Sequence, residues 1–239
     1  RDEPEFRWKG EQISRLEGFS DAVFGFSITL LIVSLDVPRT YEELRGILLG
    51  FPTFAVTFVF LFTVWYQHNL FFRRYGMTHT PVALLNGALL FLVLFFVYPV
   101  KFLGNLVING LVMNVYLGLD VPIGIDRFDS ADYPGLYTLY GLGFSAIFVI
   151  FALFYRFAWR ASQRLDLSPV ERWITYSTFL GYIAIALFPI VGIALVWTIP
   201  VPISAPLSGW FFALIWPVTW AIDRVTRKRM LGSMPRAEP

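Results

Sequence analysis

The sequence contains no cysteine and only two histidines among its 239 residues. Without cysteine there is no disulfide framework, no thiolate metal site and no cysteine nucleophile, so we expect neither zinc nor iron–sulfur chemistry. Two histidines also leave little material for a membrane-embedded active site, which needs a base, a nucleophile or a metal set. The sequence therefore predicts a protein that is not an enzyme and has no cofactor and no fixed metal ion.

Charged residues are also scarce. They make up 15% of the chain, whereas hydrophobic residues make up 56%. A soluble domain carries roughly 25% charged residues. This deficit indicates an integral membrane protein in contact with the lipid bilayer. The formal net charge of +2 is small, and the basic residues form no continuous stripe, so no nucleic-acid partner is expected.

Long apolar runs are abundant, and a helix needs about 20 such residues to cross a bilayer. Five runs reach this length, at 13–37, 47–72, 82–106, 135–159 and 173–197. A sixth, at 208–222, is shorter, and the apolar stretch TIPVPISAPL before it can supply part of the missing length. The six runs predict an all-α integral membrane protein with six transmembrane helices per subunit. The corresponding division of the chain is a cytoplasmic N-terminal segment at 1–12, a transmembrane domain at 13–222 and a basic cytoplasmic tail at 223–239.

The basic residues predict how the helices are oriented. They gather in the N-terminal segment, in the second and fourth connections and in the C-terminal tail. Because cytoplasmic loops carry the excess of lysine and arginine, both termini of this multi-pass protein are expected in the cytoplasm, with the helices in the cell membrane. The third connection, 107–134, holds four aspartates and is predicted to be a solvated outer loop.

The first apolar run begins with the polar stretch RLEGFSD, at residues 15–21. Ser14 and Glu17 form the S-x-x-E pattern of a capping box, which predicts that a helix starts there. Arg15 and Asp21 point roughly 120° apart on that helix, so they make a poor ion pair. Each needs partners elsewhere, unless Arg15 extends to the membrane interface. The candidate partners, together with Ser20, are Trp65, His68 and Asn86.

Two neighbouring stripes run along the same predicted helix. One is apolar throughout and includes Phe19, Val23, Phe26, Leu30, Val33 and Val37. The other holds the small residues Gly18, Ala22, Gly25 and Thr29. Small residues let helices approach closely in lipid, whereas the apolar stripe is suited to filling a narrow space. The Thr29 hydroxyl has the alternative of bonding to its own helix.

The motif RLEGFSD matches R-x-x-x-F-S-D, the signature of the first helix in the transmembrane protein 175 family of potassium channels. WYQHN, at residues 65–69, resembles the W-x-x-H-H of that family's second helix, with Asn69 in place of the second histidine. Asn86 and an apolar third helix ending near Pro99 are also similar. The resemblance covers roughly the first 100 residues.

The resemblance implies a potassium channel with modest selectivity, assembled as a homotetramer around one pore and lacking a P-loop selectivity filter. It implies that the first helices line the pore, with apolar layers at Phe26, Leu30 and Val33 and a polar ring at Thr29. Phe26 departs from the branched aliphatic residue usual at its layer, which implies a tight resting constriction. The motif residues are expected to hold helices together rather than touch potassium ions. They are Arg15, Phe19, Ser20, Asp21, Trp65, His68 and Asn86.

Two other functions fit the same residues. A secondary ion or solute transporter usually has broken helices, and Pro99 and Pro189 are candidate breaks, although no matching halves are evident. A proton-conducting pore would use Asp21 or His68 as a relay.

Overall fold

The computed structural model describes residues 6–10, 12–33, 37–119, 121, 129–201, 203–204 and 214–233. Every regular element among these residues is a helix, which confirms the all-α prediction. The parts of the predicted helices at 34–36 and 208–213, and the end of the predicted tail, lie outside the described residues.

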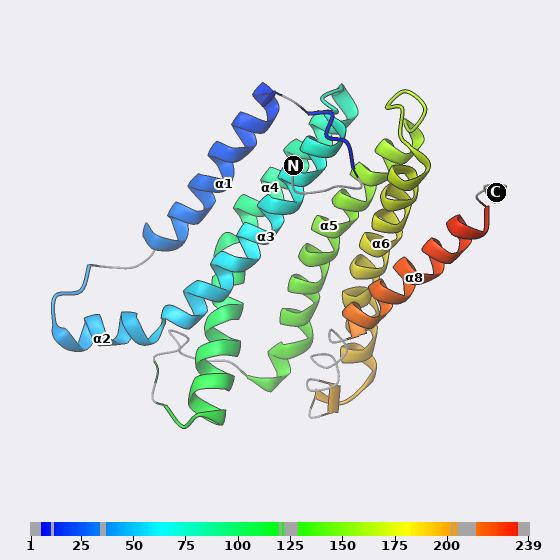
Figure 1. Ribbon diagram of the computed structural model, residues 1–239. Helices are drawn as coiled ribbons and strands as arrows, with labels where there is room; N and C mark the ends of the chain where they lie inside the picture. The colour runs from blue at the N-terminus through cyan, green and yellow to red at the C-terminus, as the bar shows by residue number, and fades with distance from the viewer. Residues whose placement is uncertain are drawn as a thin grey trace. The chain divides into compact units, whose positions relative to one another are not determined.

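Figure 1 labels the α-helices in chain order from the N-terminus to the C-terminus. The helical elements are α1 (Arg15–Val33), α2 (Tyr41–Leu49), α3 (Phe51–Tyr75), α4 (Thr80–Gly104), η1 (Asn105–Tyr116), η2 (Ser130–Asp132), α5 (Tyr133–Arg160), α6 (Pro169–Thr198) and α8 (Ile215–Ser233).

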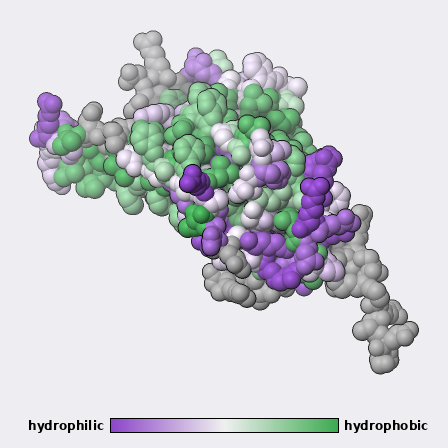
Figure 2. All heavy atoms as spheres, turned by 90° about the horizontal axis from the view of Figure 1, so that it is seen from above, coloured by the Kyte–Doolittle hydropathy of each residue, from purple (hydrophilic) through white to green (hydrophobic). Residues whose placement is uncertain are grey.

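Four described helices are long and apolar enough to cross a membrane, and they overlap the second to fifth predicted runs. They are Phe51–Tyr75, Thr80–Tyr116, Tyr133–Arg160 and Pro169–Thr198. The first run appears as α1 and the sixth overlaps α8, but neither is among these four. Large apolar side chains are exposed along α1, α3, α4 and α5, and Figure 2 shows apolar surface over much of one face of the molecule.

The predicted third run, 82–106, corresponds to α4, but the prediction that a loop follows from residue 107 is wrong. α4 continues past Pro99, and its last residue leads directly into the π-helix η1. Thr53 on α3 donates a hydrogen bond to the buried Asn109 side chain on η1 at 2.7 Å. A Cβ atom on Gly104 would lie 2.8 Å from the Thr53 methyl group, so glycine allows this close approach. Pro189 likewise lies inside α6 without ending it.

The second predicted run is divided in the structure. Residues 47–49 belong to α2 rather than to the spanning helix α3. The α2 helix is capped by Thr40, whose hydroxyl accepts the Glu43 N–H at 3.2 Å. Because α2 has its own N-cap, it is a separate helix that ends before α3 begins. The apolar pattern alone does not show this division, so it placed the start of the second spanning helix a few residues too early.

The chain forms two compact units. One comprises the described residues of Arg1–Gln12, Phe71–Leu85 and Ser130–Pro239. Its core is aromatic: the Phe71 and Phe154 rings stack at 4.8 Å, and the Tyr75 and Thr175 hydroxyls lie 2.7 Å apart. In this unit α6 packs against both α5 and α8 (Figure 1).

The N-terminal segment 6–10 is bound into this first unit by hydrogen bonds. The N–H groups of Lys9 and Gly10 donate to the Arg73 carbonyl at 3.2 and 3.1 Å. The Arg7 N–H donates to the Glu171 carboxylate at 2.7 Å. Glu171 also accepts the Ser168 N–H at 2.7 Å, which completes the capping box of α6. The Glu171 carboxylate is thus buried among donors at the start of a helix, where a negative charge is favourable.

The other unit comprises the described residues of Ile13–Leu70 and Asn86–Asp129. It contains α1, most of α3 and α4, and η1, and its apolar core includes the buried side chains of Phe24, Leu31, Leu61 and Val93. The motif residues of the first helix therefore belong to this unit.

Candidate functional site

The predicted capping box at the start of α1 is present. Both the N–H and the hydroxyl of Ser14 donate to a Glu17 carboxylate oxygen, at 2.9 and 2.7 Å, and the Glu17 N–H donates to the Ser14 hydroxyl at 3.2 Å. These bonds satisfy backbone donors that a helix start otherwise leaves open. Glu17 is buried, so the charge in the first turn is fixed by these contacts rather than exposed to solvent.

One face of α1 is buried inside its own unit. Its members recur every three or four residues, and they are Glu17, Ser20, Phe24, Ser27 and Leu31. Ser20 and Ser27 donate to the carbonyls of Leu16 and Val23, each at 2.8 Å. A hydroxyl that bonds to its own helix is inexpensive to bury, which allows this face to alternate polar and apolar side chains.

Ser20 on α1, Asn86 on α4 and His68 on α3 form a hydrogen-bonded chain. The Asn86 amide donates to the Ser20 oxygen at 2.9 Å, and its carbonyl oxygen lies 2.7 Å from His68 Nε2. An amide oxygen only accepts, so in this arrangement the proton is on His68 Nε2. All three residues are buried, at 1% exposure or less. The chain joins three helices through neutral groups.

Asp21 has a partner of its own. The Trp65 indole N–H on α3 donates to its carboxylate at 2.8 Å. Beside this bond, the Phe24 ring on α1 lies 5.6 Å from the His68 ring. We call Ser20, Asp21, Trp65, His68 and Asn86 the polar network of α1. Its residues are five of the seven motif residues that the sequence singled out.

The other two motif residues are not part of these contacts. Phe19 is 62% exposed, and Arg15 is exposed as well. Among the described residues, Arg15 forms no hydrogen bond and no ion pair. Within one chain, then, Asp21 and Ser20 have the partners that the sequence proposed for them, whereas Arg15 does not.

Two of the predicted pore residues, Phe26 and Thr29, lie on a face of α1 that its own unit leaves uncovered. Phe26 is 58% exposed, Thr29 is exposed and Leu30 is partly buried. Val33 is the last residue of α1, and its side chain lies outside the described part of the structure. A Cβ atom added at Gly18 or Gly25 would meet no heavy atom within 4 Å. This face therefore has room for a neighbouring surface.

The Thr29 hydroxyl follows the alternative that the sequence left open. It donates to the Gly25 carbonyl of its own helix at 2.9 Å. Because the hydrogen is used in this bond, the oxygen lone pairs remain available on the exposed face. The arrangement leaves an acceptor beside an apolar surface.

Sequence reasoning missed two features. The first is the buried stripe of α1, which lies beside the two stripes that the sequence emphasised; the spacing of Glu17, Ser20 and Ser27 was the signal for it. The second is the pair formed by Thr53 and Asn109, whose 56-residue separation gave no local signal. Within the described residues, no three His, Asp or Glu side chains cluster closely enough to hold a metal ion.

Apolar helices of spanning length, joined by buried neutral hydrogen bonds, define an α-helical membrane protein. Residues 15–97 match the family model described as endosomal/lysosomal potassium channel TMEM175. A protein named potassium channel from Marivirga tractuosa is 34% identical over 235 residues, which cover 95% of this chain and 92% of that protein. The chain therefore belongs to the TMEM175 family of potassium channels.

Further relatives agree with this assignment. A potassium channel from Chamaesiphon minutus is 30% identical over 125 residues, covering 48% of this chain and 62% of that protein. The crystal structure of a point variant of the potassium channel MtTMEM175, in complex with a nanobody–MBP fusion, matches with a TM-score of 0.85 at 31% identity, over 95% of this chain and 98% of that one.

The crystal structure of a lysosomal potassium-selective channel TMEM175 homolog from Chamaesiphon minutus matches with a TM-score of 0.50 at 22% identity, over 90% of this chain and 96% of that one, and supports the fold alone. The family resemblance of the motifs is thus confirmed. Because this is a channel family, the prediction that the chain is not an enzyme is confirmed too.

Proposed function

We propose that this potassium channel conducts through a pore lined by α1 from four identical chains. The observation that carries the proposal is the uncovered face of α1. Phe26 and Thr29 are exposed beside Gly18 and Gly25, at which an added Cβ atom would meet no heavy atom of the described residues within 4 Å. A face with small residues suits close contact between helices, and the apolar stripe next to it suits a narrow shared axis.

The constriction is formed by Phe26, Leu30 and Val33. An apolar ring narrow enough to expel water blocks ions, and widening it restores hydration and current. A ring of four phenylalanines is bulky, which favours a tightly gated resting channel. The Thr29 oxygens, with their hydrogens held by Gly25, would present acceptors toward the same axis. Without a filter of backbone carbonyls to replace the hydration shell, we expect only a modest preference for potassium over sodium.

The polar network of α1 acts in this proposal as a positioning device. Ser20, Asn86 and His68 link three helices inside one chain, and the bond between Trp65 and Asp21 adds a second link. These groups lie on or next to the buried face of α1, on the side away from Phe26. They hold the helix without touching the permeant ions, whereas Arg15 and Phe19 are free to meet a neighbouring copy.

The proposal includes six crossings per chain. α1 and α8 would supply the first and the sixth in addition to the four helices of clear spanning character. The transmembrane domain, 13–222, lies in the cell membrane, and the segments 1–12 and 223–239 both lie in the cytoplasm. The distribution of basic residues supports this orientation, because they gather at both ends of the chain and in the second and fourth connections.

The test uses the full chain in liposomes with a potassium gradient. Phe26→Ala and Leu30→Ala should each raise potassium flux severalfold and reduce the preference over sodium, because the ring widens. Phe91→Ala is the matched control: Phe91 is 68% exposed but lies on α4. Unchanged flux and preference in both α1 variants would show that the pore is elsewhere.

Electrical recording separates the channel from the other functions. Single-channel steps would exclude a transporter, whereas saturable flux coupled to a second ion would favour one. Reversal potentials measured under separate potassium and proton gradients distinguish potassium conduction from a proton relay through Asp21 or His68.

A further inference from the structure

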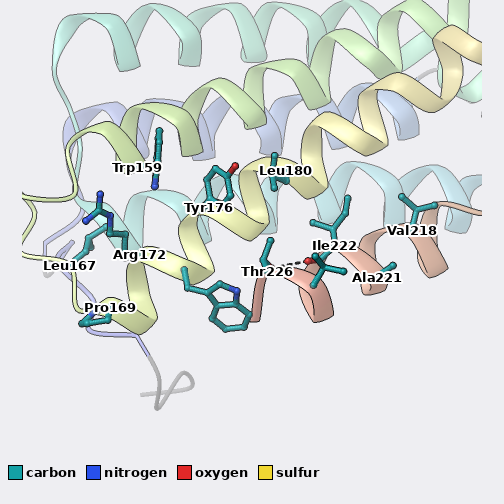
Figure 3. A pocket seen from close by; sticks show the side chains of 12 residues that line it. Trp159, Leu167, Pro169, Arg172, Tyr176, Leu180, Val218, Ala221, Ile222 and Thr226 are labelled. Carbon is teal, nitrogen blue, oxygen red and sulfur yellow. Dashed lines mark hydrogen bonds between the residues drawn. The ribbon is translucent and has the colours of Figure 1, made fainter. Parts of the chain in front are cut away.

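A cavity of about 800 Å³ lies among the end of α5, the first half of α6 and α8, all within the first unit (Figure 3). Arg172 lies near one end of this cavity, close to Pro169 and Leu167, and Val218 lies at the other end (Figure 3). No acidic residue is among those that line it. The cavity is therefore positive at one end.

Two of the lining residues, Arg172 and Trp173, carry hydrogen-bond donors. Among the described residues, the Arg172 guanidinium forms no ion pair. The Trp173 indole N–H is buried and has no hydrogen-bond partner in the described part of the chain. A buried donor without a partner is costly, so a ligand that accepts from it gains binding energy. The acceptor best matched to a guanidinium and an N–H is a phosphate or another oxyanion.

The rest of the cavity is apolar. Leu180 on α6 and Val218 and Ile222 on α8 line it away from Arg172. Leu180 lies eight residues beyond Arg172, which is about 12 Å along a helix. Thr226 also lines the cavity, but its hydroxyl already donates to its own helix. A small soluble anion would leave this apolar length unfilled, whereas an amphiphile with a charged head would occupy both ends.

We propose that this cavity binds an anionic phospholipid. Its phosphate accepts hydrogen bonds from Arg172 and Trp173, and one acyl chain lies between α6 and α8. The helix α6 has the length and composition of a membrane span, so Arg172 near its start lies at the interface and Leu180 deeper. Arg160, the last residue of α5, and Arg164, between α5 and α6, are both exposed and attract the same anionic leaflet. The inference is independent of where the pore lies.

The test is native mass spectrometry of the purified full chain with phosphatidylglycerol and, separately, with phosphatidylcholine. The parent protein should retain phosphatidylglycerol preferentially. Arg172→Gln should weaken that retention about tenfold, the effect expected when a charge-assisted hydrogen bond is lost. Trp173→Phe keeps the aromatic ring and removes only the N–H, so it should weaken retention by about fivefold. Arg160→Gln removes an exposed charge that does not line the cavity and should change little.

Two further arms identify the ligand source. Ala221→Trp fills the apolar end without touching Arg172 and should abolish phosphatidylglycerol retention. Glycerol phosphate, which carries the headgroup without the chains, should not displace the lipid. The proposal is overturned if Arg172→Gln retains the lipid as the parent does, if Arg160→Gln loses it equally, or if glycerol phosphate competes at equal concentration. Unchanged size-exclusion elution and helical circular dichroism for each variant establish that retention, and not folding, has changed.

Discussion

Two buried polar contacts, one in each unit of this chain, differ in their chemistry. In the first unit a carboxylate, Glu171, accepts hydrogen bonds from Arg7 and Ser168 at the start of a helix. In the second, Asn86 joins Ser20 and His68 through neutral groups well inside α4. A buried charge is expensive unless several donors surround it, and a helix start provides them. Neutral amide and imidazole groups cost less inside a span. Position along the helix therefore decides which chemistry suits each of these two contacts, and Glu17 at the start of α1 follows the same rule as Glu171.

The largest effect should come from the charged contact. Glu171→Ala leaves the N–H groups of Arg7 and Ser168 without their acceptor and removes the α6 cap, so we expect a loss of about 3 kcal/mol in the free energy of unfolding. Thermal unfolding in detergent, read by size exclusion, measures it. Asp166→Asn is the control, because the Asp166 side chain is 95% exposed and pairs with Arg7 only at 3.6 Å. An equal loss in the free energy of unfolding for both variants would contradict the idea that the buried Glu171 carboxylate contributes more stability than the exposed Asp166 carboxylate.

The neutral contact should rank second. Asn86→Leu removes the acceptor that faces His68 Nε2 and the amide that donates to the Ser20 oxygen, both at buried positions, and a loss of about 2 kcal/mol is expected. The same unfolding assay applies, with Leu84→Ala as control because Leu84 is 70% exposed on the same helix. If Asn86→Leu is as stable as its control, the neutral chain does not hold α1.

A third substitution tests the one charged member of the polar network of α1. Trp65→Phe keeps a ring and removes the N–H that Asp21 accepts, at an expected cost of about 1 kcal/mol. In the double variant with Asp21→Ala, the two losses should sum to more than the measured total, because both substitutions remove the same bond. Strict additivity would show that the 2.8 Å contact contributes nothing.

The smallest effect on stability should come from Thr29→Val, within about 0.5 kcal/mol. The Thr29 hydroxyl is exposed and bonds only to its own helix in the described chain. The same variant should nevertheless change the potassium-to-sodium preference in liposomes if the uncovered face of α1 lines the pore. A large stability loss without a change in preference would place this face in a packed contact instead.

Local sequence signals predicted much of α1 and little of what lies far from it. The capping box at Ser14 and Glu17 and the partner set of Ser20 and Asp21 followed from spacing and from donor–acceptor inventory. The periodicity described faces of α1 correctly but did not indicate which face its own unit covers. That choice depends on residues of α3 and α4.

The errors have a shared physical origin. The sequence predicts a loop from residue 107 and offers Pro99 as a candidate break, although the helical stretch that contains Pro99 continues to Tyr116. A membrane helix tolerates proline when its neighbours satisfy the freed backbone groups. Arg7 and Glu171, which form a hydrogen bond, are 164 residues apart in the sequence. Neither the residues around Arg7 nor those around Glu171 indicate that contact. Contacts of this range depend on the assembled fold, so a residue pattern read within one helix does not contain them.

The unbroken helical stretch Thr80–Tyr116 has one more consequence. Its 37 residues extend for about 50 Å, whereas a bilayer's hydrocarbon layer is about 30 Å thick. Its far turns carry outward-facing Leu111, Val115 and Tyr116. In a thicker membrane these apolar side chains would contact the hydrocarbon layer. In a thinner membrane only the last turns of the helix would lie outside it. This helix equips the protein to tolerate bilayers of different thickness without shifting the turn that bears Asn86.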